Sequence, residues 1–227
     1  MARILPFWKA VNEALSIAME LDKNVVTLGL GTDDPKRVFG TTTGLTEKFG
    51  SHRGFDMPTS ENAMTGVAIG ASLNGIRPVM SHQRLDFFLL AMDQLVNNAA
   101  KWFYMFGGKK SVPITIRLII GRGWGQGPQH SQSLQSWFAH VPGLKVVMPT
   151  TAYDAKGLLL SAIFDNNPVI FLEHRWLHNI EGDVPVGDYR VPLDKANVLG
   201  TGGDLTIVSL SYMTIEALHA QEALQKQ

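Results

Sequence analysis

One carboxylate in the stretch from Asp56 to Gly66 is the first candidate for chemistry. Glu61 follows Met-Pro-Thr-Ser and precedes an apolar helical pattern, so an extended segment turns into a helix at this residue. In α/β folds such a turn is a common position for catalytic groups, and a carboxylate there can hold or transfer a proton. The alternative is a structural carboxylate in a first helical turn that Thr59 or Ser60 caps. Taken alone, a short motif favours that structural interpretation.

A glycine-rich loop and a pair of histidines are further candidates. The loop, residues 121–127, has alternating glycines but lacks the Lys-Ser/Thr ending of a phosphate-binding loop. It is interpreted as a mobile segment that orders over an active site, or as a plain flexible surface loop. His174 and His178 are four residues apart, a spacing that can bind zinc from one helical face. No third ligand is evident, so both are interpreted as surface residues.

Composition excludes several classes of protein. The 227 residues include twenty basic and twenty acidic residues without a Lys/Arg run, so no nucleic-acid partner is expected. Zero cysteines exclude disulfides and thiolate chemistry and favour the cytoplasm as the compartment. No uninterrupted apolar run of about 18 residues occurs, so no membrane association is expected.

The spacing of apolar residues predicts the elements that must position these groups. Buried parallel strands are expected at 24–30, 78–81, 113–120, 144–148, 168–172 and 205–210. Helices are expected at 7–21, 61–73, 87–104, 152–164 and 214–224. The alternation predicts an α/β fold with a doubly wound, mainly parallel sheet and helices on both faces.

A loss of pattern after the fifth predicted strand indicates the domain organisation. Residues 1–175 form one predicted domain. The polar stretch 176–203, which carries prolines and ends in a glycine-rich run, is a predicted linker. Residues 204–227 are then the start of a truncated second α/β domain at the carboxyl end of the chain.

Several short segments, taken in order, resemble a known family. They are Glu61-Asn62-Ala63 with Gly66, Ala91-Met92-Asp93-Gln94, Asn97 to Lys101, Gln129-His130-Ser131-Gln132, Pro142 to Val147, Asp154 to Gly157 and Asp165 to Pro168. This set resembles the pyrimidine-binding, transketolase-like domain in the beta subunit of the thiamine diphosphate-dependent 2-oxo acid dehydrogenase decarboxylating component. The fold implied is the thiamine diphosphate-binding fold.

The resemblance implies a role for three side chains. Glu61 matches the glutamate that hydrogen-bonds the cofactor aminopyrimidine and activates it, which requires partial desolvation of the carboxylate. Phe87 matches an aromatic residue that packs on the aminopyrimidine; without the resemblance it reads as an ordinary core aromatic. His130 matches a histidine that contacts the substrate or its acyl acceptor and can transfer protons near neutral pH.

The resemblance also implies metals and partners. The chain contains no Gly-Asp-Gly motif, which in the family holds Mg²⁺ on the cofactor diphosphate. A separate alpha-like subunit is therefore expected to hold Mg²⁺, with the cofactor at the interface of a heterotetramer, self-association of this chain, and a possible lipoyl acyltransferase as a further partner. A monovalent-cation site, with K⁺ as one occupant, is implied for a set of residues that is equally compatible with a plain helix C-terminal turn. Its members are Asp165, Asn167 and the carbonyls of Ile114, Ala162 and Ile163.

Two departures from the family leave the substrate open. Leu30 and Gly31 stand where the family has an acidic pair, and the strand before Phe87 ends in polar residues. Among these, His82 and Arg84 either offer positive charge to an acidic or phosphorylated substrate or are satisfied polar residues at a strand end.

The expected function is that of a beta-like subunit of an enzyme that decarboxylates a 2-oxo acid of the pyruvate or branched-chain type. The acyl group would pass to a lipoyl acceptor. A split transketolase-like carbon–carbon (ketol) transferase and a non-catalytic scaffold or regulatory subunit are the alternatives. Retention of Glu61 argues against the scaffold, and loss of the acidic pair argues for it.

Overall fold

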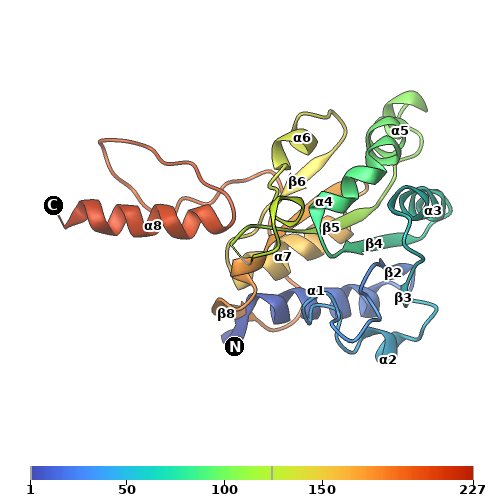
Figure 1. Ribbon diagram of the computed structural model, residues 1–227, viewed down its shortest axis with the longest axis horizontal. Helices are drawn as coiled ribbons and strands as arrows, with labels where there is room; N and C mark the ends of the chain where they lie inside the picture. The colour runs from blue at the N-terminus through green and yellow to red at the C-terminus, as the bar shows by residue number, and fades with distance from the viewer. Residues whose placement is uncertain (1, 124, 227) are drawn as a thin grey trace.

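A six-stranded parallel sheet forms the centre of the molecule (Figure 1). The computed structural model describes residues 2–123 and 125–226. The strands, in the order in which they lie across the sheet, are β3 (Gly54–Asp56), β2 (Val25–Gly29), β4 (Arg77–His82), β5 (Thr115–Ile120), β7 (Val169–His174) and β6 (Lys145–Val147). Five of them match predicted strands, whereas the short edge strand β3 was not predicted. The doubly wound α/β class is confirmed.

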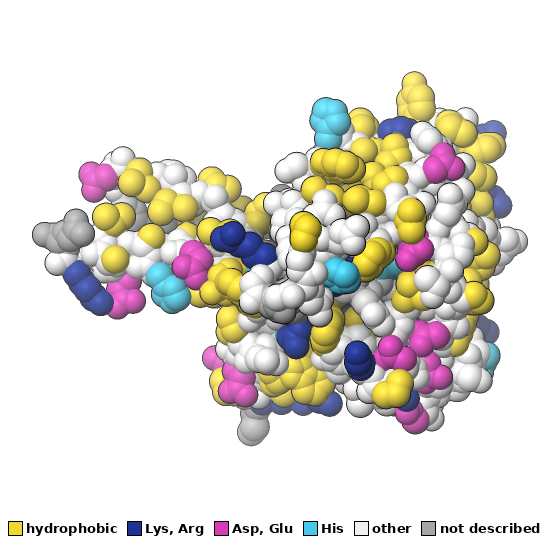
Figure 2. Space-filling view, viewed as in Figure 1, with side chains coloured by type: hydrophobic (Ala, Val, Ile, Leu, Met, Phe, Trp, Pro, Cys, Tyr) yellow, Lys and Arg dark blue, Asp and Glu magenta, His cyan; other side chains and the backbone are white. Residues whose placement is uncertain are grey.

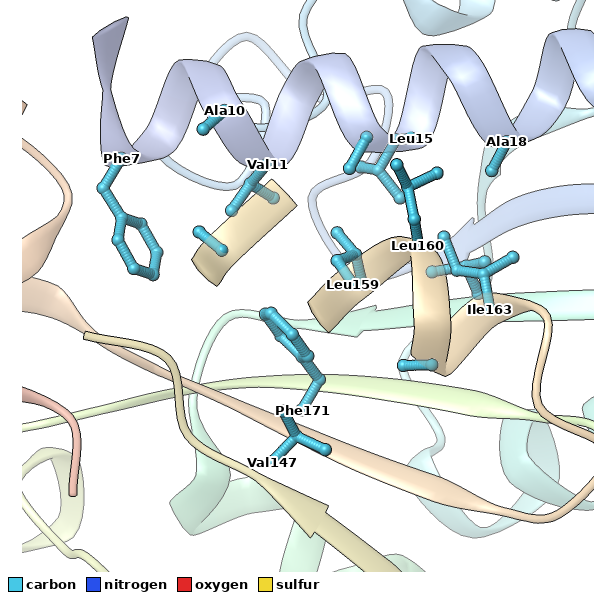
Figure 3. Close-up of a cluster of buried hydrophobic side chains, with 14 of the residues drawn as sticks. Phe7, Ala10, Val11, Leu15, Ala18, Val147, Leu159, Leu160, Ile163 and Phe171 are labelled. Carbon is cyan, nitrogen blue, oxygen red and sulfur yellow. The ribbon is translucent and has the colours of Figure 1, made fainter. Parts of the chain in front are cut away.

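Helices cover both faces of this sheet because side chains alternate between the faces along each strand. Val79 packs toward the first face and Met80 toward the second. The first face carries α1 (Phe7–Leu21), α2 (Leu45–Phe49) and α7 (Ala152–Ile163). The second carries α3 (Glu61–Leu73), α4 (Leu85–Phe88), α5 (Ala100–Met105) and α6 (Gln135–Ala139). Figure 3 shows Val11 and Leu15 of α1 directed toward Leu159 of α7 and Phe171 of β7.

The long helix predicted over 87–104 is not uniform. Helical backbone begins earlier, at Leu85, and continues through a 3₁₀ turn (Leu89–Ala91) and a π-helical stretch (Gln94–Ala99) into α5. A change of hydrogen-bond register within a helix rotates the residues that follow, and such stretches are frequent near functional sites. Apolar periodicity locates the helical run but does not detect this change.

The amino-terminal segment pairs with residues that lie inside the predicted linker. β1 (Ala2–Pro6) and β8 (Glu181–Pro185) form an antiparallel two-stranded sheet. A short 3₁₀ turn (Arg175–Leu177) precedes β8. Lys156 of α7 donates to the carbonyl of Pro185 at 2.7 Å, and Ser161 donates to the carbonyl of Val191 at 2.6 Å. This part of the predicted linker is thus packed on α7.

The strand predicted over 205–210 does not form. These residues have no regular secondary structure and lie beside α8 (Tyr212–Gln225) in an arm that projects from the body (Figure 1). Leu205 is 64% exposed and Val208 88%, and Figure 2 shows apolar side chains along the arm. A strand needs a neighbour for its backbone hydrogen bonds, and no strand of the described residues runs beside this one. Among the same residues, no helix is both long and apolar enough to cross a membrane.

Replacing Phe171 by Ala tests the core on the first face. The ring is fully buried between the sheet, α1 and α7, so its loss leaves a cavity that the surrounding elements cannot fill. We expect the free energy of unfolding in urea to fall by about 3 to 5 kcal/mol. The matched control is Val208→Ala on the exposed arm, expected to change stability by less than about 0.5 kcal/mol. Equal effects of the two substitutions would contradict this account of the core.

Candidate functional site

The three predicted site residues follow three strands of the parallel sheet at one edge. Glu61 comes after β3, Phe87 after β4 and His130 after β5. The carboxyl ends of all strands in a parallel sheet lie along one edge of the sheet. Ligands bind at this edge, at the point where successive strands are added on opposite sides of the first strand. Such a point lies at β2, because the next two strands in the chain, β3 and β4, pair with opposite sides of β2.

Glu61 is buried at the start of a helix. Its side chain is 7% exposed, and it is the first residue of α3, which packs on β4. Ser60 is the N-cap but makes no side-chain cap hydrogen bond, so the expected capping by Thr59 or Ser60 is absent. The first turn of a helix has backbone N–H groups without intrahelical partners, which favours a nearby carboxylate. Burial supplies the desolvation that the predicted proton-sharing role requires.

Phe87 and His130 are brought into contact. Their ring centroids are 5.1 Å apart and the ring planes meet at 78°, an edge-to-face arrangement. Phe87 is 39% exposed although it lies on α4 between the buried residues Asp86 and Phe88. It is therefore not the core aromatic of the alternative interpretation. An exposed ring face beside a half-buried histidine suits a flat heterocyclic ligand.

Two charged residues before Phe87 bind the two ends of the loop that carries His130. Arg84 Nη2 donates to the Gly121 carbonyl at 3.0 Å. Asp86 Oδ1 accepts from the Gln132 backbone N–H at 3.2 Å and from its Nε2 at 2.9 Å. The Arg84 Nε atom also lies 3.4 Å from the Asp86 Oδ2 atom. Arg84 is buried, and its contacts with Gly121 and Asp86 favour the interpretation of a polar residue held at a strand end.

Close backbone contact joins β2 to β4 beside Glu61. Gly29 has φ +139°, and a Cβ there would lie 2.1 Å from the Ser81 carbonyl oxygen, so only glycine fits. Leu30 then donates its N–H to the same carbonyl at 2.9 Å. Asp56 Oδ1 accepts the Thr32 N–H at 2.6 Å, which ties the segment after β2 to the end of β3. Leu30 and Gly31, the departures from the family, therefore lie at this edge.

A buried ionic network beneath the edge was not predicted. Arg117 of β5 contacts Glu173 of β7 through two nitrogen–oxygen pairs at 2.7 and 3.0 Å, and both side chains are almost completely buried. The remaining Arg117 donors reach Ser81 of β4 at 3.1 Å and Thr41 at 3.0 Å. Burial alone would raise the pKa of Glu173, but Arg117 and His178 hold it below its usual value.

The interpretation of His174 and His178 as surface residues is wrong for His178 and incomplete for His174. The His178 ring is fully buried and stacks on the Phe7 ring with 5.7 Å between the ring centroids. Its Nε2 atom lies 3.3 Å from Glu173 Oε2. His174 is half-buried, stacks on Tyr212 of α8 at 5.0 Å and lies beside Gly121. Burial lowers the pKa of His174 to about 4, with further lowering by the charges of His178 and Arg84.

The predicted monovalent-cation residues lie at the opposite edge, before β5 and β7. The Asp165 carboxylate pairs with Lys145 and accepts from the Asn167 N–H at 2.8 Å. Burial would raise the Asp165 pKa, but these donors hold it below its usual value. The three carbonyls also accept hydrogen bonds: Ile114 from Val169, Ala162 from Asp165 and Ile163 from Arg77. The cation site stays a prediction. No cluster of three or more His, Asp or Glu among residues 2–123 and 125–226 could hold a metal ion.

Comparison with known proteins agrees with this geometry. The family model described as "Transketolase, pyrimidine binding domain" matches residues 5–179. The subunit beta of acetoin:2,6-dichlorophenolindophenol oxidoreductase from Cupriavidus necator is 45% identical over 237 residues, covering 100% of this chain and 70% of that protein. The 2-oxoisovalerate dehydrogenase subunit beta of Bacillus subtilis is 41% identical, covering 98% and 68%.

Solved structures share the fold. A split gene transketolase, described as an inactive beta4 tetramer, aligns with a TM-score of 0.77 at 24% identity over 98% of this chain and 68% of that chain. The transketolase of Leishmania mexicana aligns with a TM-score of 0.59 at 17% identity, over 82% and 27%.

The fold and the match to the family model together define an α/β module of the transketolase type. The chain belongs to the transketolase pyrimidine-binding domain family, and the relatives described above are named as beta subunits. The predicted family and the predicted beta-like subunit of a thiamine diphosphate-dependent enzyme are confirmed. The roles of Glu61, Phe87 and His130 stay predictions.

The buried histidines predict how stability depends on pH. His82 is 1% exposed, and burial lowers its pKa from 6.5 to about 4. Between pH 6.5 and 4 the unfolded chain binds a proton that the folded chain does not, so stability is full above pH 6.5 and falls as the pH drops toward 4. The loss from His82 is about 3 kcal/mol, measured by urea unfolding at several pH values. His174 and His178, with lowered pKa values, add to the same trend.

The control for this dependence is His82→Leu, whose side chain cannot titrate. Its stability should fall less steeply than that of the wild type between pH 6.5 and 4. A wild-type stability that stays constant or rises on acidification over this range would refute the assignment of neutral buried histidines.

Proposed function

We propose that this chain supplies the pyrimidine-binding half of a thiamine diphosphate site, and that the complete enzyme decarboxylates a 2-oxo acid and passes the acyl group to a lipoyl acceptor. The observation that carries the proposal is a buried carboxylate, Glu61, at the same sheet edge as the exposed ring of Phe87. Relatives named for pyruvate and 2-oxoisovalerate dehydrogenases support the substrate class.

Each of the three residues has a distinct role in this proposal. Glu61 holds the proton shared with a ring nitrogen of the aminopyrimidine, and its burial strengthens that hydrogen bond. Phe87 packs on the same ring and fixes its orientation. His130 lies on the substrate side and transfers protons to or from the substrate. Bound thiamine diphosphate supplies the electron sink for cleavage of the carbon–carbon bond.

A partner subunit completes the proposed site. A diphosphate and Mg²⁺ need oxygen ligands and positive charge, yet the chain lacks the Gly-Asp-Gly motif, and its described part offers no cluster of acids and histidines for a metal. We therefore assign Mg²⁺ and the diphosphate to an alpha-like subunit. K⁺ at the Asp165 site is a further, independent element of the proposal.

Isothermal titration of thiamine diphosphate with Mg²⁺ tests this assignment. We expect no binding to the chain alone and binding to its mixture with the alpha-like subunit. In the mixture, Glu61→Gln keeps the shape of the side chain but removes its acidity, so turnover of pyruvate or 2-oxoisovalerate should fall at least about 100-fold. Binding should weaken much less than turnover.

The matched control is Glu20→Gln on α1, whose half-exposed carboxylate pairs with Lys48 on the surface. It should leave both binding and turnover unchanged. Absence of binding in the mixture would leave the non-catalytic scaffold as the explanation. Full turnover by the Glu61 variant would instead overturn the role assigned to Glu61.

A further inference from the structure

We propose that Arg84 and Asp86 are positioning residues that fix the two ends of the glycine-rich loop and thereby hold His130 against Phe87. We refer to these two side chains as the loop clamp. The role of His130 in catalysis rests on the proposed function, whereas the clamp itself is a property of this chain.

The clamp stands on a rigid base. Arg84 and Asp86 are only 4% and 8% exposed, and the residue between them, Leu85, is completely buried in the core of the second face. The Arg84 Nε atom lies 3.4 Å from Asp86 Oδ2, so the attraction between the two charges offsets part of the cost of burying them. The turn between β4 and α4 is therefore fixed by packing on one side and by an ion pair on the other.

Arg84 fixes the point at which the loop leaves the sheet. Its Nη2 donates to the carbonyl of Gly121, the first residue after β5, at 3.0 Å. Gly121 has φ +110°, and a Cβ there would lie 2.8 Å from the His174 ring. The backbone thus passes between the guanidinium and an imidazole, and this passage leaves no room for a side chain.

Asp86 fixes the point at which the loop returns. Its Oδ1 accepts two hydrogen bonds from Gln132, and a bond to a carboxylate is about twice as strong as one between neutral groups. Gln132 is two residues beyond His130. Between the anchored ends, Gly125 and Gly127 have positive φ, Pro128–His130 form a 3₁₀ turn, and Ser131 Oγ donates to the Gly127 carbonyl at 2.8 Å. His130 thus lies in a short folded turn directly before Gln132, so the anchor at Gln132 contributes to the position of His130.

The same turn also presents the aromatic ring. Phe87 directly follows Asp86, and its ring meets the His130 ring edge-on at 5.1 Å. One short segment, residues 84–87, therefore sets the ring proposed to pack on the cofactor and the loop proposed to transfer protons to the substrate. Such mutual placement matters because small displacements of a reacting group lower rates strongly.

Hydrogen exchange of the full chain, followed by mass spectrometry, tests the clamp without cofactor or partner. Asp86→Ala should speed exchange in residues 128–133 about tenfold, since two charge-assisted bonds are lost. Asp86→Asn retains an acceptor oxygen for Gln132 but loses the charge, so its exchange should lie between that of the wild type and that of Asp86→Ala. Arg84→Met should instead speed exchange at the start of the loop, near residue 121.

The matched control is Asp93→Ala, which removes an exposed carboxylate that accepts from Asn97 within its own helical stretch. It should leave loop exchange unchanged. If Asp86→Ala does not fold, Gln132→Ala removes only the side-chain bond at 2.9 Å and should raise exchange to a smaller degree. Unchanged loop exchange in both variants, or an Asn variant as fast as the Ala variant, would overturn the clamp.

Turnover of the assembled enzyme tests the consequence for His130. Asp86→Ala should lower kcat about tenfold with little change in cofactor affinity, and Asp86→Asn should recover part of that loss. Faster loop exchange with unchanged kcat would leave the clamp standing and overturn its positioning role. Loss of the proposed function itself is distinguished by Glu61→Gln, which should abolish turnover without changing loop exchange.

Discussion

The buried pair of Arg117 and Glu173 is the constraint on which the central sheet depends. Moving two charges out of water costs several kcal/mol per ion, and the cost is offset only when geometry and hydrogen bonding are good. Here the guanidinium meets the carboxylate at two points, and its other donors reach β4 and the segment after β2. The pair therefore sets the relative positions of β4, β5 and β7. The site residues that follow these strands are therefore held in fixed positions relative to one another.

The sequence-based predictions agreed best with the structure in segments that carry a strong local signal. The mostly apolar and β-branched run of β5 predicts a buried strand because it matches neither a strand with one solvated face nor a helical stripe. Pro58 before the helical pattern marked the turn at Glu61, and the structure begins α3 at that residue. The short motifs, taken in order, then indicated the family. The spacing of apolar residues alone could not have identified it. Residues 205–210 show the limit, since β-branched composition forms a strand only beside another strand.

The unpredicted features depend on contacts between residues distant in the chain. Arg117 and Glu173 each stand inside an apolar strand, and a single charge of opposite sign in two such strands was the available signal. Burial of His178 follows from its place against Phe7 and Glu173, which spacing from His174 does not reveal. Likewise, the contacts of Arg84 and Asp86 with the glycine-rich loop leave no trace in local composition. Paired charges in a turn usually indicate a solvated surface.

The pairing of β1 with β8 has a consequence for the order of folding. Pro6 lies opposite Glu181, so this small sheet joins the start of the matched residues 5–179 to the residues that directly follow them. During synthesis, α1 emerges long before α7, the helix against which its apolar face packs. Closing so long a loop is slow until the intervening sheet exists, because the entropy of closure is lost before the contacts form. The apolar face of α1 therefore stays exposed on the nascent chain until α7 and then β8 have been synthesised. Exposed apolar surface of this kind favours chaperone binding or misassembly at this helix.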